Sequence, residues 1–293
     1  ILPVAILYTI DLLLKCNLIR QAKSRLRSFS QCKIIVVAGS YGKTTTRSFI
    51  YQILQGKLEV HTAKGNVNTI LGLAKDIIDN VKSSTSICIV EIGEYREGDF
   101  KKFLKFLPRP NIAVLTAVGP QHLSTFRSQK IVDREFLSFL KLTQYSIQYI
   151  NGNNAGVKRI VNHFAGSPIL YTSDNPKHYF SFFKPELTKN IHAMQSANVA
   201  IIIAGHFGMS TAEISEALTN LELPERRLKL RKFEGFSIID DSYNINPDSA
   251  NSALSYLSTF KGRKIIITGG IVEQGKYSAQ RNIELGETIA KIV

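Results

Sequence analysis

The stretch KIIVVAGSYGKTTTRSFIYQIL, residues 33–54, predicts a strand, a glycine turn and the start of a helix in direct succession. Residues 34–37 form an unbroken β-branched run, which is typical of a strand covered on both faces of a sheet. Gly39 and Gly42 allow the turn to bring successive backbone N–H groups together, and the N-terminus of the next helix adds partial positive charge. The stretch therefore predicts a cradle for the phosphates of a nucleotide.

The first side chains of that helix strengthen this prediction. Lys43 can reach the β- and γ-phosphates of a nucleotide, and the hydroxyl of Thr44 is placed to bind Mg²⁺. The spacing Gly-x-x-Gly-Lys-Thr is shorter than that of the general P-loop, because Val37 stands where that motif has glycine. The alternative interpretation is an ordinary strand–turn–helix junction with a Gly-Lys-Thr sequence that occurs by chance.

The overall composition indicates a globular protein of a reducing compartment and argues against a nucleic-acid-binding protein. With 293 residues, 44% of them hydrophobic, the chain can bury a sizeable core. The net charge of +14 is concentrated between Lys15 and Lys57, where no acidic residue occurs, and aromatic residues are not interleaved with these cations as a base-stacking surface requires. The 3 cysteines are too few for a disulfide framework or a zinc site. We therefore expect a cytoplasmic protein that binds no nucleic acid.

Residues 1–14 are almost wholly apolar. As a helix they would extend about 21 Å, against roughly 30 Å for the hydrocarbon core of a bilayer, so they cannot span a membrane alone. Both ends of the sequence look cut. Two interpretations remain open: the segment is the inner end of a membrane helix whose cationic flank, residues 15–27, lies on the cytoplasmic side, or it is a soluble docking helix.

Two more strands bring polar groups to the same edge of the expected sheet. Residues 86–92 predict a buried strand that carries Glu91 at its end, and residues 112–116 predict a strand followed by a turn that contains His122. Ligands of parallel α/β sheets bind outside the carboxyl ends of the strands, so we expect these groups to lie near Lys43. The alternatives are a solvated carboxylate at Glu91 and a turn histidine whose ring is satisfied by backbone.

The spacing of strands and helices predicts an α/β fold, with a central parallel sheet and helices on both faces. Residues 145–151 predict a further strand. Residues 193–208 predict an apolar helix that carries Gln195 and Asn198 on a common side.

A new α/β pattern follows a boundary near Pro224. Residues 229–233 and 236–240 predict two strands joined by a Glu-Gly turn, and Asp248 with Ser249 can cap the next helix.

The last unit is expected to contain a strand at residues 264–268 and a helix that continues to residue 293, which is about half of what such a domain needs. The expected division of the chain is an apolar and basic segment at 1–30, a central nucleotide-binding domain at 31–223 and an incomplete C-terminal domain at 224–293.

With these residues placed, the chain resembles the Mur ligase superfamily of ATP-dependent amide-forming enzymes, and it is most similar to the D-alanyl-D-alanine-adding branch. Five motifs match in order: GSYGKTTT at 39–46, KGNVNTILG at 64–72, Glu91-x-Gly93, VGPQHL at 118–123 and DDSYNINPDS at 240–249. The resemblance implies a central P-loop-type sheet followed by a truncated Rossmann-like C-terminal α/β domain. A match to the N-terminal uridine-nucleotide domain of the muramyl enzymes is not found in residues 1–293, so we expect a ligase without it.

The resemblance also implies roles for single residues. Lys43 and Thr45 would bind ATP phosphates, Thr44 and Glu91 would hold a first Mg²⁺, and His122 would hold a second. The residues expected to act directly in catalysis are Lys43, Glu91, His122 and Arg227. The residues expected to bind ATP are Gly39, Ser40, Gly42, Lys43, Thr44, Thr45, Asn198 (adenine), Arg227 (γ-phosphate), Asp241 (ribose), Tyr243, Asn244 and Asn246.

One departure from the family pattern concerns the second metal. The family carries a carbamoylated lysine shortly after the His turn, whereas this chain has Asp133, Arg134 and Glu135 near that place. Either Glu135 supplies a carboxylate to the metal, or the second metal is weakly held. A second departure is Met194, which precedes Gln195 in the altered start of the adenine helix.

The activity implied by the resemblance is ATP-dependent addition of an amino acid or D-alanyl-D-alanine to the carboxylate of a peptidoglycan precursor, through an acyl-phosphate. The expected partners are ATP, that carboxylate and the amine. Two alternatives stay open: a ligase of the same superfamily that acts on a non-muramyl acid, of polyglutamate or cyanophycin type, and a non-catalytic, membrane-tethered nucleotide-binding protein.

Overall fold

The computed structural model describes residues 2–65, 67–174, 177–243 and 245–293. Asn244, which the resemblance places in the nucleotide cleft, lies outside the described residues.

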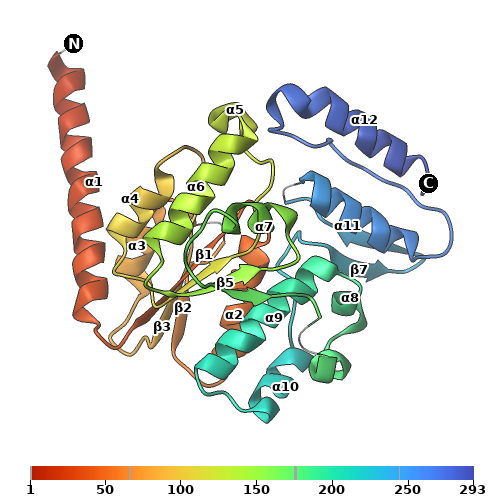
Figure 1. The fold of residues 1–293 in the computed structure, drawn as a ribbon, viewed down its shortest axis with the longest axis horizontal. Helices are drawn as coiled ribbons and strands as arrows, with labels where there is room; N and C mark the ends of the chain where they lie inside the picture. Colours follow the sequence, from red (N-terminus) through yellow and green to blue (C-terminus); the bar gives the residue numbers. More distant parts are fainter. Residues whose placement is uncertain (1, 66, 175–176, 244) are drawn as a thin grey trace.

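A six-stranded parallel sheet forms the centre of the molecule, in the order β2-β3-β1-β4-β5-β6 (Figure 1). The four inner strands confirm the strands predicted from the sequence. The short edge strands β2 and β6 were not predicted. The six strands are β1 (Lys33–Ala38), β2 (Val60–Thr62), β3 (Ile87–Glu91), β4 (Ile112–Leu115), β5 (Ile147–Asn151) and β6 (Ile169–Tyr171).

Helices cover both faces of this sheet, which confirms the predicted fold class. One face packs against α1 (Leu2–Ser28), α3 (Ile70–Asn80), α4 (Asp99–Phe106), α6 (Gln129–Leu142) and α7 (Ala155–Val161). The other packs against α2 (Lys43–Leu54), α8 (Pro185–Thr188), α9 (Ile191–His206) and α10 (Thr211–Thr219). The short connecting helices are α5 (Leu123–Phe126) and η1 (Lys177–Phe182).

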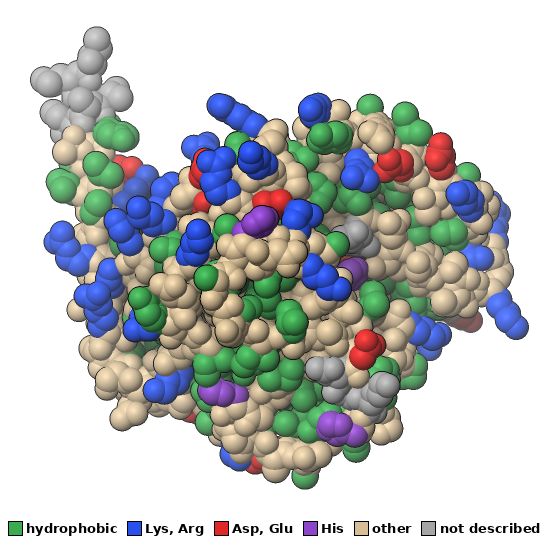
Figure 2. Space-filling view, in the orientation of Figure 1, with side chains coloured by type: hydrophobic (Ala, Val, Ile, Leu, Met, Phe, Trp, Pro, Cys, Tyr) green, Lys and Arg blue, Asp and Glu red, His purple; other side chains and the backbone are tan. Residues whose placement is uncertain are grey.

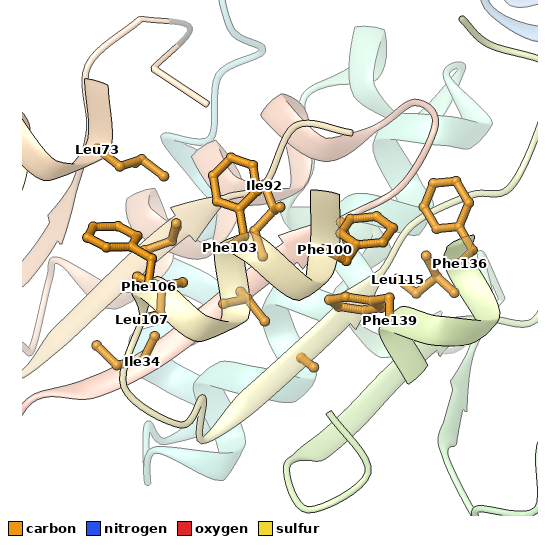
Figure 3. Packing of buried hydrophobic residues seen from close by; sticks show 14 of the residues in the cluster. Ile34, Leu73, Ile92, Phe100, Phe103, Phe106, Leu107, Leu115, Phe136 and Phe139 are labelled. Atoms are coloured by element: carbon orange, nitrogen blue, oxygen red, sulfur yellow. The ribbon is translucent and has the colours of Figure 1, made fainter. Parts of the chain in front are cut away.

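Alternation along the strands divides the core into two layers. In β1, Ile34 and Val36 belong to one apolar cluster, whereas Ile35 and Val37 belong to the other. Because successive strand side chains point to opposite faces, an unbroken apolar strand needs cover on both. Figure 3 shows the first layer, in which phenylalanines of α4 and α6 pack over the sheet; the ring of Phe100 lies 5.2 and 5.0 Å from those of Phe136 and Phe139.

The two halves of α1 have different surroundings. In the C-terminal half, Ala22 and Leu26 are buried against the core, and the Arg25 guanidinium donates two hydrogen bonds to the carbonyl oxygen of Val81, at 3.0 and 2.8 Å. The other half projects from the body of the molecule, and Leu13 is 64% exposed there (Figure 1). No helix in the described part of the chain is long and apolar enough to cross a membrane.

The chain beyond Leu223 forms a hairpin and two helices, and a small apolar cluster lies between the helices. The hairpin, β7 (Lys229–Phe233) and β8 (Phe236–Asp240), confirms the two predicted strands. It is followed by α11 (Pro247–Ser258), η2 (Gly275–Tyr277) and α12 (Ser278–Ile289), and the cluster contains Ala250, Leu254, Ile271 and Leu285.

One prediction in this part needs correction. Residues 264–268 do not form a strand, and Ile267 is 96% exposed. A strand needs a neighbour for its backbone hydrogen bonds, and none of the described strands pairs with this segment.

The start of α11 is capped with the help of Ser249, as predicted. The backbone N–H groups of Asn246 and Ser249 donate to each other's side-chain oxygens at 2.9 and 3.0 Å. The side chain of Asp248, the other predicted cap, lies outside the described residues.

The contrast within α1 gives a stability prediction. Leu26→Ala should lower the free energy of unfolding by about 2–4 kcal/mol, because it removes buried methyl groups and leaves a cavity. Leu13→Ala is the matched control on the same helix and should change stability by less than about 0.5 kcal/mol. Urea unfolding followed by circular dichroism measures both. Equal effects of the two substitutions would show that α1 does not dock as described.

Candidate functional site

The carboxyl ends of β1, β3 and β4 bring the predicted groups to one edge of the sheet. Glu91 is the last residue of β3 and pairs in register with Val37 of β1. The cradle follows β1 directly. The turn after β4 leads to His122, which stands at the N-cap position of α5.

The glycines of the cradle are required by its geometry. Gly39 has φ 147°, and a Cβ atom there would lie 2.0 Å from the Thr116 hydroxyl oxygen. Gly42 has φ 81° and stands at the N-cap position of α2. The turn can therefore press closely against the end of β4 and still expose the N-terminus of α2, where unpaired N–H groups and the helix dipole favour an anion.

Ser40 is engaged within the protein. Its N–H donates to the Ala117 carbonyl oxygen at 2.8 Å, and its hydroxyl donates to the Gly119 carbonyl oxygen at 3.1 Å and accepts from the Gly119 N–H at 3.0 Å. The structure thus gives Ser40 a supporting role, since it fastens the cradle to the turn after β4.

Lys43 pairs with a carboxylate that sequence reasoning missed. Its ammonium lies 3.2 and 3.3 Å from the two carboxylate oxygens of Glu94, and it also contacts the Gly39 carbonyl oxygen. Glu94 is 2% exposed, and this burial raises its pKa to about 7, although the Lys43 charge acts in the opposite direction. The one signal in the sequence was a second carboxylate three residues after Glu91.

Glu91 and Thr44 form a group of oxygen atoms suited to Mg²⁺. The Thr44 hydroxyl donates to Glu91 Oε1 at 3.1 Å. Glu91 Oε2 is buried without a hydrogen-bond partner, and Arg47 Nε lies 3.4 Å away at an ion-pair distance. Among the described residues, no cluster of three or more His, Cys, Asp or Glu side chains could enclose a metal. Mg²⁺ needs no such cluster, because one carboxylate, phosphate oxygens and water suffice.

His122 contacts two residues that were also not predicted. Its Nδ1 lies 2.5 Å from a carboxylate oxygen of Glu273, which precedes η2, and its ring packs against that of Tyr95 with 4.6 Å between centroids. Burial lowers the pKa of His122, and Glu273 partly opposes this effect.

Glu135 does not lie at the metal position suggested from the sequence. Its carboxylate accepts the N–H groups of Gly98 at 2.8 Å and Phe100 at 2.9 Å, and the side chain is 2% exposed. Both oxygens therefore cap the N-terminus of α4, where the first N–H groups of a helix lack intrahelical partners. The suggestion that Glu135 supplies a metal carboxylate is corrected accordingly.

The C-terminal part of the chain reaches the cradle through Arg227. Its Nη2 lies 3.4 Å from the Thr44 hydroxyl, and its guanidinium stacks 4.0 Å above the ring of Tyr243. Burial lowers the pKa of Arg227. Asp241 accepts the Leu228 N–H at 3.1 Å, and burial raises its pKa to about 6. Residues on both sides of Pro224 therefore face the same site.

A cavity of about 80 Å³ separates these two sides. Its lining includes Thr45, Gln195, Arg227, Asp241 and Asn246. Asn198 is 1% exposed and donates to the carbonyl oxygen of Thr172.

A wider cavity of about 830 Å³ continues from the same site and shares Tyr41, His192 and Gln195 with the smaller one. Arg159 and Arg281 lie on its wall. The smaller cavity is below the roughly 300–1,000 Å³ that a ligand site usually needs, whereas the wider one is within that range.

Comparison with known proteins agrees with this architecture. Curated relatives include the UDP-N-acetylmuramoyl-tripeptide–D-alanyl-D-alanine ligase of Bacillus subtilis (strain 168), which is 27% identical over 279 residues that cover 88% of this chain and 60% of that protein. The chain thus spans about 60% of the length of that relative.

Solved structures share the fold. MurF from Acinetobacter baumannii superposes with a TM-score of 0.80 at 22% identity, covering 94% of this chain and 65% of that one. The MurF ligase from Thermotoga maritima in complex with ADP gives a TM-score of 0.79 at 22% identity, covering 94% and 68%. The family model of the Mur ligase middle domain matches residues 37–212. Because that match extends over more than half of the chain, the chain belongs to the Mur ligase family.

Proposed function

We propose that this chain belongs to an ATP-dependent ligase that forms an amide bond on a peptidoglycan precursor. The observation that carries the proposal is the convergence of Lys43, Thr44 and Glu91 from the sheet edge with Arg227 from the C-terminal part. Relatives named as D-alanyl-D-alanine-adding ligases, and an ADP complex of one structural neighbour, support ATP as a substrate and D-alanyl-D-alanine as the amine.

The proposed reaction has two steps. A precursor carboxylate attacks the γ-phosphorus of ATP, which breaks the bond to the β-phosphate oxygen and releases ADP. The amine then attacks the carbonyl carbon of the acyl-phosphate, phosphate leaves, and the nitrogen gives up a proton. A carboxylate is a poor electrophile until its oxygen is phosphorylated, so the second step depends on the first.

The charges at the sheet edge suit the first step. Lys43 and Arg227 supply positive charge where the γ-phosphate accumulates negative charge, and they do so in a partly buried site where electrostatic interactions are strong. Mg²⁺, held by Thr44 and Glu91, would neutralise phosphate oxygens. Residues 31–223 and 224–293 are proposed as the two domains that enclose the nucleotide.

Nucleotide binding requires local rearrangement. Lys43 has to leave Glu94 for the phosphates, and the cavity of about 80 Å³ has to widen by movement of the residues around Arg227. We expect opening and closure of the C-terminal domain to accompany each turnover. A ligase that acts on a different acid, and a non-catalytic nucleotide-binding protein, remain the alternatives. Amine-dependent release of ADP would exclude the non-catalytic protein. A comparison of UDP-muramyl peptides with free amino acids as acceptors shows whether the ligase acts on a different acid.

Lys43→Ala tests the phosphate assignment. We expect nucleotide affinity to fall and amine-dependent ADP release by the intact protein to decrease by about 10²–10³-fold, because the variant lacks a preorganised charge at the γ-phosphate. The control is Lys33→Ala, an exposed lysine at the opposite end of β1, which should leave both quantities unchanged. Wild-type ADP release by Lys43→Ala would remove Lys43 from the phosphate site.

Glu94→Gln tests the competition for Lys43. A neutral amide should hold the ammonium less strongly, so the affinity for ATP should rise by about tenfold. In the wild type, the raised pKa means that the folded state binds the Glu94 proton more tightly than the unfolded state does. Stability is therefore lost as pH rises from about 4.5 to about 7, and Glu94→Gln lacks this loss.

The stability of Glu94→Gln relative to the wild type should accordingly increase across that pH window by on the order of 1–3 kcal/mol. Glu97→Gln is the control, because Glu97 is exposed and pairs with Arg134 on the surface. Calorimetry and nucleotide titration at several pH values measure both effects. Weaker ATP binding by Glu94→Gln would contradict the proposed competition.

Attachment to the inner face of a cell membrane stays a prediction from the sequence. Figure 2 shows apolar and basic side chains on the surface of the projecting part of α1. Lys15 and Arg20 of this helix are exposed. Intact protein should bind anionic vesicles and resist release by salt, because salt screens charge but does not weaken burial of apolar surface. A variant that lacks residues 1–14 should be released from the vesicles by salt. Complete release of the intact protein by salt would contradict membrane insertion.

A further inference from the structure

The segment around Glu273 docks on the turn that carries His122. The Glu273 carbonyl oxygen accepts the Leu123 N–H at 3.2 Å, which satisfies one of the first N–H groups of α5. Gln274 is 2% exposed and donates to the Pro120 carbonyl oxygen at 3.4 Å. These backbone contacts place the Glu273 side chain beside the imidazole without help from the nucleotide.

The two residues that meet here both have unusual backbone conformations. His122 has φ 52° and Glu273 has φ 62°, in the left-handed region that residues other than glycine seldom adopt. Such conformations persist where the surrounding contacts determine them. The contacts of Leu123, Pro120 and Gln274 described above provide that surrounding, and the result is the 2.5 Å approach of the Glu273 carboxylate to His122 Nδ1.

The chemical consequence concerns the other ring nitrogen. A carboxylate that accepts the Nδ1 proton favours the tautomer in which Nε2 carries a lone pair, and it holds the ring in one orientation. Tyr95 packs on the ring and restricts it further. The turn that leads to His122 is fastened to the cradle, because the Ser40 hydroxyl donates to the Gly119 carbonyl oxygen and accepts from the Gly119 N–H.

We propose that Glu273 is a positioning residue that prepares His122 to bind a second metal ion, apart from the ion assigned to Thr44 and Glu91. Glu273 lies in the C-terminal part of the chain and His122 lies in the turn after β4. The contact therefore prepares His122 for metal binding only when the C-terminal part is docked on the sheet edge. This inference rests on the proposed function, since it assumes a metal-bound nucleotide at this edge.

The first test measures Mn²⁺ binding to the protein in the presence of ADP by electron paramagnetic resonance. Glu273→Ala should weaken binding of the second Mn²⁺ ion by about 10–100-fold and leave binding of the first, at Thr44 and Glu91, unchanged. Glu273→Gln should restore most of it, because the amide oxygen still accepts the Nδ1 proton. The control is Glu287→Gln, an exposed carboxylate on α12, which should bind Mn²⁺ as the wild type does. Wild-type affinity in Glu273→Ala would overturn the proposal.

A double-mutant cycle shows whether Glu273 acts through His122. In a His122→Ala background, Glu273→Ala should cause no further loss of Mn²⁺ affinity. An undiminished loss in that background would mean that Glu273 acts by another route. Failure of the wild type itself to bind Mn²⁺ with ADP would instead contradict the proposed function, so the two failures can be told apart.

The second test needs no metal or nucleotide. The ¹⁵N NMR shifts of His122 in the wild type and in Glu273→Gln should show the proton on Nδ1, whereas Glu273→Ala should show a mixture of tautomers. If Glu273→Ala folds poorly, the tautomer of His122 in the wild type and in Glu273→Gln still tests the proposal. A wild-type His122 with its proton on Nε2 would contradict the proposal.

Discussion

Parallel pairing of β1 with β3 on one side and β4 on the other is the constraint on which the site depends. The register places Val37 opposite Glu91 and Ala38 opposite Leu115, so three strands end at the same level. The cradle follows β1, Glu91 is the last residue of β3, and the turn that carries His122 follows β4. A shift of one residue in β3 would turn Glu91 toward the other face of the sheet, because strand side chains alternate.

Charged groups at this edge lie against partners within the protein. Lys43 pairs with Glu94, Arg47 lies against Glu91, and Arg227 stacks on Tyr243 beside Thr44. Buried charges are costly without partners, so these contacts stabilise the folded edge. We propose that phosphate binding exchanges one set of partners for another. Glu94 makes this exchange dependent on pH, since its pKa of about 7 lies in the range where proteins commonly work.

Much of the fold could be predicted because its signals are local. The β-branched run of β1, the glycines of the cradle and the apolar helix α9 each show in a short stretch of sequence. The strand predicted at residues 264–268 was wrong because a strand depends on a neighbour that a local pattern cannot supply. The short edge strands β2 and β6 were missed for the same reason.

The residues of the candidate site could be predicted in part. What the prediction missed are contacts between residues that are distant in the sequence. Lys43, Thr44 and Glu91 could be recognised from motifs. Glu135 could not be assigned correctly, since its partners are backbone N–H groups more than thirty residues earlier. Glu273 meets His122 across about 150 residues, and no spacing rule predicts such a pair.

A crystal structure of the protein with ADP and Mg²⁺ bound would test the assignment of the sheet edge most directly. We expect the β-phosphate at the N-terminus of α2, Lys43 released from Glu94 and bonded to phosphate oxygen, and the metal on Thr44 and Glu91. A nucleotide bound away from this edge, or a Lys43 that still pairs with Glu94 while phosphate is bound, would contradict the nucleotide site described for this chain.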